Sequence, residues 1–565
     1  MLSTYTWPRY SYRPAPELNA AAARRVPLLI VGAGPVGLSA AIDAALRGQA
    51  VIVLDEDNTV SVGSRGVCYA KRTLEIFDRL GLAERVLAKG VTWNVGRTFH
   101  GEREVFSFDL LPDSGHQRPG MVNLQQYYLE QYLVERAIQL PLIDLRWQHK
   151  LVQVTPADDV VRLDIDSADG PYTLHADWLV AADGTRSTVR RQMGLDIEGR
   201  VFQDRFLIAD IVLHGDLFPR ERTERRFWFA PPFHAGESAL MHRQADDVWR
   251  VDFQLGWDAD PEVEKEPGRV QARVRAALDQ QGFAHIGFDL EWVSVYTFQC
   301  RRMVKFRHGR VLFVGDSAHQ VSPFGARGAN SGIQDADNLV WKLKWVIDGA
   351  APAALLDSYD QERGAAADEN ILNSTRSTDF MTPKTRVAHL LRDAVLSLAD
   401  DVPAGRALVN SGRLSVPTRL SDSPLNTPDG EAFEGWMSPG APLDDAPVGD
   451  ADGERHGPAW LLRALGPAEG AAFVLLHFGA VAAATRDAAS TLGLALVTVL
   501  STAEAAADAG PGVVCDSEGL AASRYDARPG TCYLVRPDQH VAARWRCFSA
   551  AAVRAALRRA TGHTQ

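Results

Sequence analysis

The chain has 565 residues, of which 46% are hydrophobic and 23% charged, and its formal net charge is −11. This length and composition exclude a wholly disordered or fibrous protein and are typical of a soluble globular chain with several domains. An acidic chain lacks the electrostatic footprint for DNA or RNA and is repelled by anionic membranes, so neither nucleic acid nor membrane is expected as a partner.

The first third of the chain follows an α/β pattern. Residues 1–25 are expected to be an irregular leader, and residues 26–60 are predicted to form a strand, a glycine turn, a helix and a second strand. The predicted elements up to residue 182 are strands at 27–31 and 50–54, helices at 36–46, 71–80 and 124–140, loops or short strands over 95–120, and alternating strands over 145–182. The apolar run 178–182 predicts a buried strand.

The pattern changes after residue 200. Short alternating runs punctuated by Pro and Gly predict an antiparallel sheet over 200–300, with one helix near 269–281. Residues 310–347 return to a strand, a loop and a long helix, and 352–400 are mostly helical. The Pro/Gly/Asp-rich stretch 403–452 is a predicted linker, and the Ala-rich remainder indicates a small α/β domain.

Cysteine usage and hydropathy bear on the compartment. The five cysteines are scattered, and no CxxC pair or His/Cys cluster with zinc spacing occurs. We therefore expect free thiols, a reducing compartment and no metal site. Residues 1–25 contain no apolar core of signal-peptide length, and the sequence has no run of about 18 apolar residues that would predict a transmembrane helix. The cytoplasm is the expected location.

The segment Gly32–Gly37 has the spacing GxGxxG between a predicted strand and a predicted helix. In this setting Gly32 allows the tight turn, Gly34 lets the backbone approach a pyrophosphate, and Gly37 lets helix and strand pack closely. Asp55 follows at the end of the second strand, where a carboxylate can accept hydrogen bonds from the adenosine ribose. The turn predicts dinucleotide binding but does not choose between NAD and FAD.

Two further carboxylates stand at the ends of predicted buried strands. Asp183 precedes Gly184 after one strand, and Asp316 follows Gly315 after another. A carboxylate at the carboxyl end of such a strand lies where open α/β sheets bind ligands, and it can accept hydrogen bonds from a ribityl or ribose chain. A glycine-rich loop follows, and Gly328, Ala329 and Asn330 precede a predicted helix with apolar residues at helical spacing, namely Ile333, Ala336, Leu339, Val340, Leu343 and Val346.

In this order the three motifs resemble those of the single-component (group A) FAD-dependent aromatic hydroxylases, the p-hydroxybenzoate hydroxylase-like family. The resemblance is greatest to the branch acting on 3-(3-hydroxyphenyl)propionate and related phenols, and it spans about residues 26–400. Residues 533–545 resemble part of the degenerate thioredoxin-like domain found in that branch. The implied fold class is α/β: a Rossmann-like FAD-binding domain with an interleaved antiparallel-sheet substrate domain (the p-hydroxybenzoate hydroxylase fold), plus a degenerate thioredoxin-like C-terminal domain.

The resemblance divides the chain and assigns residues. The implied divisions are a leader at 1–25, FAD-binding segments at 26–195 (with inserted loops at 95–120) and 299–400, the substrate-binding sheet at 196–298, a linker at 401–454 and the thioredoxin-like domain at 455–565. The implied FAD contacts are Gly32, Gly34, Pro35, Val36, Gly37 and Asp55 on the ADP half, Arg65 beside the pyrophosphate, Gln126 from a helix, Leu151 near adenine, Asp183 serving both FAD and NAD(P)H, Asp316 on the ribityl chain, Pro323 by the reactive edge of the isoalloxazine, and Gly328, Ala329 and Asn330 at the helix N-terminus.

The chain departs from the family pattern at two places. Asp55 replaces the commoner Glu at the end of the second strand, a change that we expect to be tolerated. Ala326–Arg327 stands where the family usually has Gly-Gln, which puts a positive side chain near the flavin or its entrance.

The predicted sheet over 200–300 is expected to roof the substrate pocket. Along the predicted strand at 249–255 a period of two predicts two faces, with Trp249, Val251, Phe253 and Leu255 on one and Arg250, Asp252 and Gln254 on the other. Candidate substrate contacts are His242, Asp252, Gln254 and Tyr296, and for each of them a surface or structural role is the open alternative. No catalytic base is assigned, and His319 is interpreted as structural.

The family implies an aromatic monooxygenase that uses FAD, NADH or NADPH, and O₂. NAD(P)H docks transiently and reduces FAD, and reduced flavin adds O₂ as a C4a-hydroperoxide that hydroxylates a phenolic ring. The sequence has no second GxGxxG, which agrees with transient docking. The expected substrate is a small phenolic compound, phenylpropanoid or hydroxybenzoate-like, and a homodimer is possible.

Three other interpretations were compared with this one. A polyketide (anthracycline-type) aromatic hydroxylase shares the FAD and thioredoxin-like domains and differs in pocket size, and a flavin-bound protein without hydroxylation also stays open. A flavin-dependent halogenase is disfavoured because the WxWxIP motif is absent. In the C-terminal domain Cys515, Cys532 and Cys547 lack CxxC spacing, which favours a packing or dimerisation role over thiol–disulfide exchange.

Overall fold

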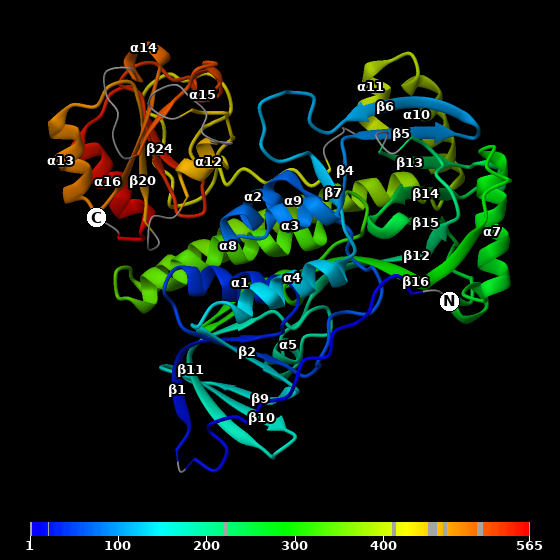
Figure 1. Cartoon of the computed structure of the whole chain (residues 1–565), viewed down its shortest axis with the longest axis horizontal. Coiled ribbons are helices and arrows are strands. Elements are labelled where there is room, and N and C mark those ends of the chain that lie inside the picture. Colours follow the sequence, from blue (N-terminus) through cyan, green and yellow to red (C-terminus); the bar gives the residue numbers. More distant parts are fainter. Residues whose placement is uncertain are drawn as a thin grey trace.

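The computed structural model describes residues 3–20, 22–219, 223–409, 414–449, 460–466, 472–505 and 512–563. Figure 1 shows three parts: a first α/β unit that contains β1, β2 and β11, a second sheet that contains β12 to β16, and a C-terminal α/β unit that contains β20 and β24. The helices α8 and α9 cross the middle of the molecule between them.

The first unit is built on a mostly parallel sheet, because apolar buried strands alternate with helices along the chain. Its order is β17-β18-β11-β1-β2-β8, and β9 and β10 continue it beside β11. The strands are β1 (Arg24–Val31), β2 (Val51–Asp55), β8 (Ile143–Trp147), β9 (His149–Pro156), β10 (Val161–Ser167), β11 (Tyr172–Ala181), β17 (Arg307–His308) and β18 (Val311–Phe313). Since β1 pairs in parallel with β2 and β11, and β11 with β18, their carboxyl ends meet at one edge of the sheet.

Helices cover this sheet, and most of the predicted ones are present. The helices of this part are α1 (Pro35–Leu46), α2 (Lys71–Leu80), α3 (Ala83–Lys89), α4 (Gln126–Ile138), α5 (Thr188–Gln192), α8 (Gly328–Ile347) and α9 (Asp357–Met381), with short 3₁₀ turns at Gly315–Ser317 and Ala353–Leu356. Pro35 occupies the first position of α1, where its missing N–H costs nothing. Helix α2 ends at Gly81, whose φ of +79° is left-handed. A small sheet of β3 (Cys68–Ala70), β7 (Met121–Asn123) and β4 (Val91–Trp93) lies beside α2.

The second sheet has the order β19-β16-β12-β15-β14-β13-β5-β6. Its elements are β5 (Val95–His100), β6 (Arg103–Asp109), β12 (Glu198–Leu213), β13 (Glu224–Phe229), β14 (Ser238–Arg243), β15 (Val248–Gln254), β16 (Phe288–Arg302) and β19 (His319–Gln320), with 3₁₀ turns at Pro232–His234 and Ala245–Asp247 and the helices α6 (Pro261–Glu264) and α7 (Pro267–Gln280). Helix α7 covers one face, where Trp249, Val251 and Phe253 pack in a common core with Val270 and Val274. The predicted division of β15 into two faces is therefore confirmed.

The second sheet also includes a segment that the sequence left as loops or short strands. Residues 95–109 form β5 and β6, and β5 pairs in parallel with β13. The pairing joins residues more than 120 positions apart, so local periodicity gave no sign of it.

The C-terminal unit has a five-stranded sheet in the order β22-β21-β20-β23-β24. Its elements are β20 (Val474–Phe478), β21 (Ala495–Leu500), β22 (Val513–Cys515), β23 (Cys532–Val535), β24 (Val541–Trp545), α12 (Leu461–Ala464), α13 (Ala483–Thr491), α14 (Thr502–Ala505), α15 (Leu520–Arg524) and α16 (Ala550–Ala560). The parallel pair β20 and β21 around α13, followed by the antiparallel pair β23 and β24 and then α16, agrees with the thioredoxin-like expectation.

The predicted linker is largely folded onto the C-terminal unit. It begins after α10 (Arg386–Ala399) with α11 (Pro403–Val409), and residues 410–413 and 450–459 lie outside the described residues. Between these, Gly440 N donates to Val541 O at 2.8 Å and Leu443 N donates to Gln539 O at 2.9 Å. Met437 and Val448 are buried in the core of the unit. The Pro/Gly-rich composition indicated a lack of regular structure, but not this packing.

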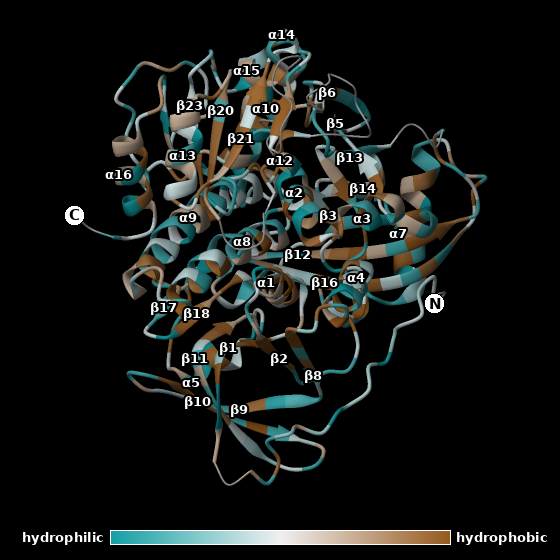
Figure 2. Ribbon diagram, turned by 60° about the vertical axis from the view of Figure 1, so that its left-hand side comes forward, coloured by the Kyte–Doolittle hydropathy of each residue, from teal (hydrophilic) through white to brown (hydrophobic). Residues whose placement is uncertain are grey.

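Hydrophobic residues gather on inner strands such as β2 and β12, as Figure 2 shows. Among the described residues, no helix combines the length and apolarity that crossing a bilayer requires. The described residues also contain no cluster of three or more His, Cys, Asp or Glu side chains suited to a metal ion.

Candidate functional site

The glycine turn between β1 and α1 has the close contacts that the spacing predicts. Gly32 has a φ of +104°, and a Cβ there would lie 2.5 Å from Ala182 O at the end of β11. A Cβ on Gly37 would lie 2.0 Å from Gly32 O, whereas one on Gly34 would meet nothing within 4 Å. The first and third glycines are therefore required for packing, and the second faces open space of the kind that a pyrophosphate needs.

Asp55 braces this turn. Its Oδ2 accepts a hydrogen bond from Ala33 N at 2.6 Å, and its Oδ1 accepts one from Asp57 N at 2.9 Å. Burial raises the pKa of the carboxyl. The side chain lies at the expected strand end, and each oxygen has a backbone donor, which sequence reasoning did not foresee.

The glycine turn, the Gly-Asp turn and the start of α8 converge in space at Val36. A Cβ on Gly315 would lie 3.0 Å from Val36 Cγ2, and one on Gly332 would lie 2.7 Å from the same atom. The start of α1, the Gly-Asp turn after β18 and the first turns of α8 are thus in direct contact. Glycine at both positions is what permits this approach.

A buried ionic network holds the Gly-Asp turn in place. Asp335 Oδ2 accepts from Gly315 N at 2.9 Å and forms a 2.6 Å contact with His319 Nε2, and Asp335 Oδ1 accepts from Arg363 Nε at 2.7 Å. Although burial opposes ionisation of Asp335, His319 and Arg363 lower its pKa. The structural role expected for His319 is therefore what the contacts show, and the contribution of Arg363 had no sequence signal.

Asp316 follows β18, and protein surrounds its carboxyl on most sides. Burial raises the pKa of its carboxyl, yet the side chain is open to solvent. Thr185 Oγ1 donates to Asp316 Oδ2 at 3.2 Å. Burial and the charge of Asp316 also raise the pKa of Tyr296 to about 12, although that side chain is 43% exposed. Groups that protein surrounds on most sides, but that solvent still reaches, are expected where a ligand binds.

Asp183 has spare hydrogen-bonding capacity at the end of β11. Its Oδ2 accepts from Val189 N at 3.0 Å, while its buried Oδ1 has no hydrogen-bond partner among the described residues. Burial raises the pKa of this carboxyl. A buried acceptor without a partner is costly and suits a site that a ligand completes.

Arg65, Gln126 and Ala329 lie around one loop. Gln126 Oε1 accepts from Gly66 N at 3.0 Å, and a Cβ on Gly66 would lie 3.9 Å from the Ala329 side chain. Arg65 has a φ of +40° and an exposed side chain. The loop that carries Arg65 therefore meets the start of α4 and the N-terminus of α8, as expected for groups around one cofactor.

The N-terminus of α8 is fixed by Asn330. Its Oδ1 accepts from Ala70 N at 2.9 Å, and its Nδ2 donates to Cys68 O at 2.8 Å, so the side chain is engaged with protein. The backbone N–H groups of Gly328 and Ala329 belong to the first turn, which has no partners within the helix. Pro323 is exposed in the loop before the helix.

Leu151 is placed apart from these groups. It is buried in β9, opposite Ile165 of β10, and packs in the core of the first unit. Its side chain has a structural role, and only its backbone position relates to the expected adenine contact.

The polar face of the second sheet lies on the loop of Arg65. Arg250 NH1 donates to Arg65 O at 2.9 Å, and Arg250 Nε donates to Asp252 Oδ1 at 3.0 Å. A Cβ on Gly63 would lie 2.3 Å from the ring of Trp292 on β16. Burial raises the pKa of the neighbouring Asp210 to about 6. This face therefore covers the first unit, as a roof would.

The four candidate substrate contacts have different surroundings. His242 is buried, its Nδ1 lies 2.9 Å from Asn123 Nδ2, and burial keeps its pKa well below the usual range. Gln254 is held by Ser238 N and donates to Asp204 at 3.0 Å. Asp252 pairs with Arg250, whereas Tyr296 is exposed and lies near Asp316.

An aromatic cluster missed by the sequence analysis adjoins Tyr296. The ring centroids of Phe298 and Phe324 are 5.0 Å apart, those of Phe206 and Phe324 are 5.2 Å apart, and Phe298 lies 5.5 Å from Tyr296. Phe324 follows Pro323 in the loop before α8. The surroundings of Tyr296 are therefore aromatic.

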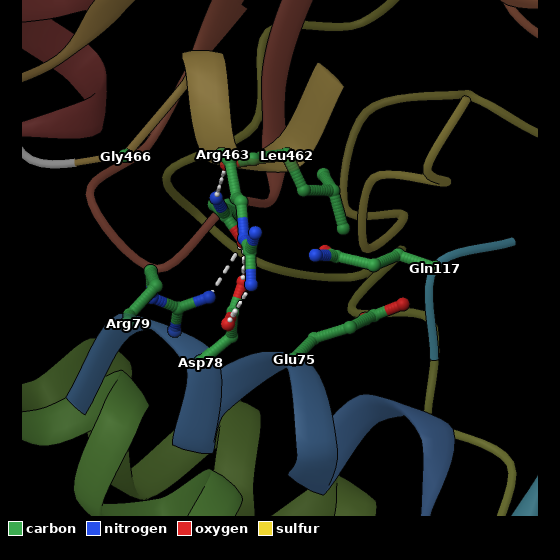
Figure 3. A pocket seen from close by; sticks show the side chains of 8 residues that line it. Glu75, Asp78, Arg79, Gln117, Leu462, Arg463 and Gly466 are labelled. Carbon is green, nitrogen blue, oxygen red and sulfur yellow. Dashed lines mark hydrogen bonds and ion pairs between the residues drawn. The ribbon is translucent and has the colours of Figure 1, made fainter. Parts of the chain in front are cut away.

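A hollow of about 520 Å³ lies between α2 and the C-terminal unit (Figure 3). It is lined by Glu75, Asp78, Arg79, Gln117, Leu462, Arg463, Gly466 and Gln539. Arg463 is paired with Asp78 at 2.8 Å, and Glu75 with Lys71 at 2.6 Å. Arg79 is paired with Asp337. Because each charged group in its lining already has a protein partner, this hollow has the character of a polar domain contact.

The fold and the site define a flavoprotein of the aromatic hydroxylase class, and comparison with known proteins agrees. The family model described as FAD binding domain matches residues 25–374, and the chain belongs to this family. The 6-methylpretetramide 4-monooxygenase of Streptomyces rimosus is 31% identical over 540 residues, covering 92% of this chain and 90% of that protein. A 3-(3-hydroxy-phenyl)propionate/3-hydroxycinnamic acid hydroxylase of Mycolicibacterium gilvum is 31% identical over 416 residues, covering 72% and 71%.

Solved structures show the same fold. The flavin-dependent monooxygenase PieE in complex with FAD and substrate has a TM-score of 0.79 at 24% identity and covers 96% of this chain and 100% of that one. The anhydrotetracycline hydroxylase OxyS from Streptomyces rimosus has a TM-score of 0.67 at 25% identity and covers 95% and 99%. The protein is thus a flavin-dependent aromatic monooxygenase with the p-hydroxybenzoate hydroxylase-like fold, and FAD is its cofactor.

Proposed function

We propose that this chain hydroxylates a phenolic aromatic compound, with NADH or NADPH as the electron donor and O₂ as co-substrate. The single observation that carries the proposal is that the exposed Tyr296, which adjoins the aromatic cluster of the second sheet, lies near enough to the strand-end carboxylate of Asp316 for that charge to raise its pKa. FAD, when bound, supplies the reduction of O₂ and the transfer of one oxygen atom to the ring.

The chain's own residues bind, orient and exclude water. In the proposal, FAD lies against Gly32, Gly34, Pro35, Val36, Gly37, Asp55, Arg65, Gln126, the Leu151 backbone, Asp183, Asp316, Pro323, Gly328, Ala329 and Asn330. The N-terminus of α8 offers N–H groups and its positive dipole end to the negative charge of reduced flavin. The polar face of the second sheet closes the site from above, and the phenylalanine cluster keeps that side dry.

Tyr296 is the substrate contact that the geometry favours. With a pKa of about 12, its hydroxyl stays protonated at neutral pH and can donate a hydrogen bond to a substrate oxygen. We do not assign a proton acceptor for the phenol. We also propose the division of the chain into FAD-binding segments at 26–195 and 299–400, a substrate-binding sheet at 196–298 and a thioredoxin-like domain at 455–565.

A polyketide-type substrate is the second candidate, and one observation favours it. The Streptomyces rimosus monooxygenase matches 92% of the chain, including the C-terminal unit, whereas the Mycolicibacterium gilvum hydroxylase matches 72%. The two candidates differ in substrate size: a one-ring phenol with a short acidic chain, or a polycyclic phenol.

A substrate panel tests the proposal and separates the candidates. Hydroxyphenylpropionates, hydroxybenzoates and polycyclic phenols are each mixed with the holoenzyme, and the consumption of NADH and NADPH is followed together with product mass. We expect at least one phenol to accelerate NAD(P)H oxidation and to gain one oxygen atom. Release of peroxide without a hydroxylated product from every phenol would contradict the proposal and favour a flavin-bound protein without hydroxylation.

A further inference from the structure

An extended segment before β1, here called the strap (Thr4–Tyr12), lies across the first unit. The chain runs from beside β16 past β9 and on to β1, as Figures 1 and 2 both show. Tyr5 is buried, and the side chains of Trp7, Tyr10 and Tyr12 are partly buried. The sequence predicted an irregular leader here, and the structure agrees about its backbone but shows that its aromatic side chains are packed.

The strap is fastened to the loop 56–61, which directly follows Asp55. Four hydrogen bonds join the two: Tyr10 N donates to Asn58 O at 2.8 Å, Thr59 Oγ1 to Pro8 O at 2.7 Å, Arg9 NH1 to Asn58 Oδ1 at 3.0 Å, and Trp7 Nε1 to Ser61 O at 3.1 Å. Donors come from both sides of the contact, so the loop and the strap hold each other along most of the length of the loop.

Ring stacking adds to these bonds next to the strand end. The rings of Tyr10 and Trp147 are 4.7 Å apart and nearly parallel, at 14°. Trp147 stands opposite Asp55 in the pairing of β2 with β8. Tyr10 therefore contacts the residue that pairs directly with Asp55 on the neighbouring strand.

The other end of the strap reaches the second sheet. Thr4 N donates to Glu291 Oε1 at 3.0 Å on β16, next to Trp292, whose ring covers Gly63. Tyr5 stacks on Tyr127 at 4.3 Å, beside Gln126. The strap thus bridges the first unit and the roof on the side of the adenosine end of the site.

We propose that the strap is a clasp that keeps the loop 56–61 closed over the adenosine end of FAD and slows FAD dissociation. This inference rests on the proposed placement of FAD at Asp55. A group bound at the carboxyl end of β2 lies against the loop that follows that strand, so it leaves freely only when the loop moves. Opening the loop then requires the strap bonds to break as well. Trp7 and Tyr10 act through the loop and are positioning residues.

The test compares FAD release from the holoenzyme and from variants of the strap. Trp7→Ala and Tyr10→Ala remove a hydrogen bond or a stacked ring, and each is expected to accelerate FAD release about tenfold, which is the effect of losing about 1.4 kcal/mol. Tyr10→Phe keeps the stacked ring and is expected to release FAD at close to the wild-type rate. Release is measured from the recovery of free-FAD fluorescence after the holoenzyme is diluted into buffer without FAD.

Tyr12→Ala is the matched control. Its ring stacks on His149 and its hydroxyl donates a hydrogen bond to Asp169, and within the described part of the chain it makes no hydrogen bond to the loop 56–61. We expect this variant to release FAD at the wild-type rate, although the urea unfolding of its apoprotein changes about as much as that of Tyr10→Ala. This pairing separates fastening of the loop from general stability.

Two results would overturn the inference while leaving the proposed function standing. One is FAD release from Trp7→Ala and Tyr10→Ala at the wild-type rate, and the other is equal acceleration by Tyr12→Ala. Wild-type protein that takes up no FAD would overturn the proposed function, and the clasp with it.

Discussion

In the proposed function, single carboxylates at strand ends position FAD. Asp183 keeps a buried oxygen that has no hydrogen-bond partner among the described residues, and burial raises the pKa of Asp316 although its side chain is exposed. Both carboxylates cost free energy in the apoprotein, because burial opposes the charge of a carboxylate that has too few donors. Ribityl and ribose hydroxyls are donors of the kind that would repay that cost.

Replacing Asp316 with Ala should weaken FAD binding about 10- to 100-fold, because one or two hydrogen bonds to a charged acceptor are lost. Equilibrium titration of the apoprotein with FAD measures the change. Asp368→Ala is the control, since that side chain is exposed and its ion-pair partner among the described residues is Arg302. Unchanged FAD affinity in Asp316→Ala would remove this residue from the site.

At the scale of elements, α8 connects the candidate cofactor site to the C-terminal unit. Lys342 of α8 lies 2.6 Å from Glu362 of α9, and Arg536, in the turn between β23 and β24, lies 2.6 Å from the other oxygen of Glu362. All three side chains are fully buried. Although burial alone would raise it, Arg536 and Lys342 lower the pKa of Glu362.

Glu362→Gln should destabilise the protein by about 3–5 kcal/mol, because it leaves the buried Lys342 without its carboxylate and removes one of the two carboxylates that pair with the buried Arg536. Urea unfolding of the holoenzyme measures this loss. Glu369→Gln changes an exposed glutamate of the same helix and should have almost no effect. A loss as small for Glu362→Gln as for the control would show that the buried pair contributes nothing.

Sequence periodicity predicted the elements whose partners are close along the chain. The spacing of apolar residues placed α1 and α2 to within about two residues, and the apolar runs placed β1, β2 and the end of β11. The same spacing predicted α8 but put its start after Asn330, whereas the helix begins at Gly328. The strand-end carboxylates could be predicted for the same reason, because a parallel sheet brings its carboxyl ends together.

Other features depend on contacts that no local pattern encodes. The pairing of β5 with β13, the folding of residues 414–449 onto the C-terminal unit and the packing of the strap each join segments far apart in sequence. The same limit applies within the site. Sequence could not show that backbone donors occupy Asp55 or that Asn123 holds His242. Nor could it show that Tyr296, one of the four candidate substrate contacts, lies near Asp316.

At the scale of the whole molecule, buried acidic groups with raised pKa values set the alkaline limit of stability. Burial raises the pKa of Cys532 to about 12, and it also raises the pKa of Cys68, Cys300 and several tyrosines, including Tyr533. The unfolded chain loses these protons at lower pH than the folded protein does. Their contribution to stability is therefore full below about pH 9 and is lost as the pH rises through the range from 9 to 12.

The free energy of unfolding should fall steadily above pH 9, and Cys532 alone should account for about 2 kcal/mol of the loss by pH 10.5. Cys532→Ala should flatten the profile in this range, and Cys547→Ala, which removes an exposed thiol whose charge adds to the raised pKa of Cys532, should flatten it less. Urea unfolding between about pH 7 and about pH 10.5, which spans the ordinary pKa of a thiol, provides the comparison. Profiles of identical slope for wild type and Cys532→Ala would contradict this account of the buried thiol.

The claim on which the rest depends is that one FAD lies across the ends of β1, β11 and β18 with its flavin facing the N-terminus of α8. Titration of the apoprotein with FAD, followed by the visible spectrum, tests it most directly. We predict saturation at one FAD per chain, with a flavin band perturbed relative to free FAD and restored to the free form by denaturation. Apoprotein that stays folded and leaves the spectrum of added FAD unchanged would contradict the account.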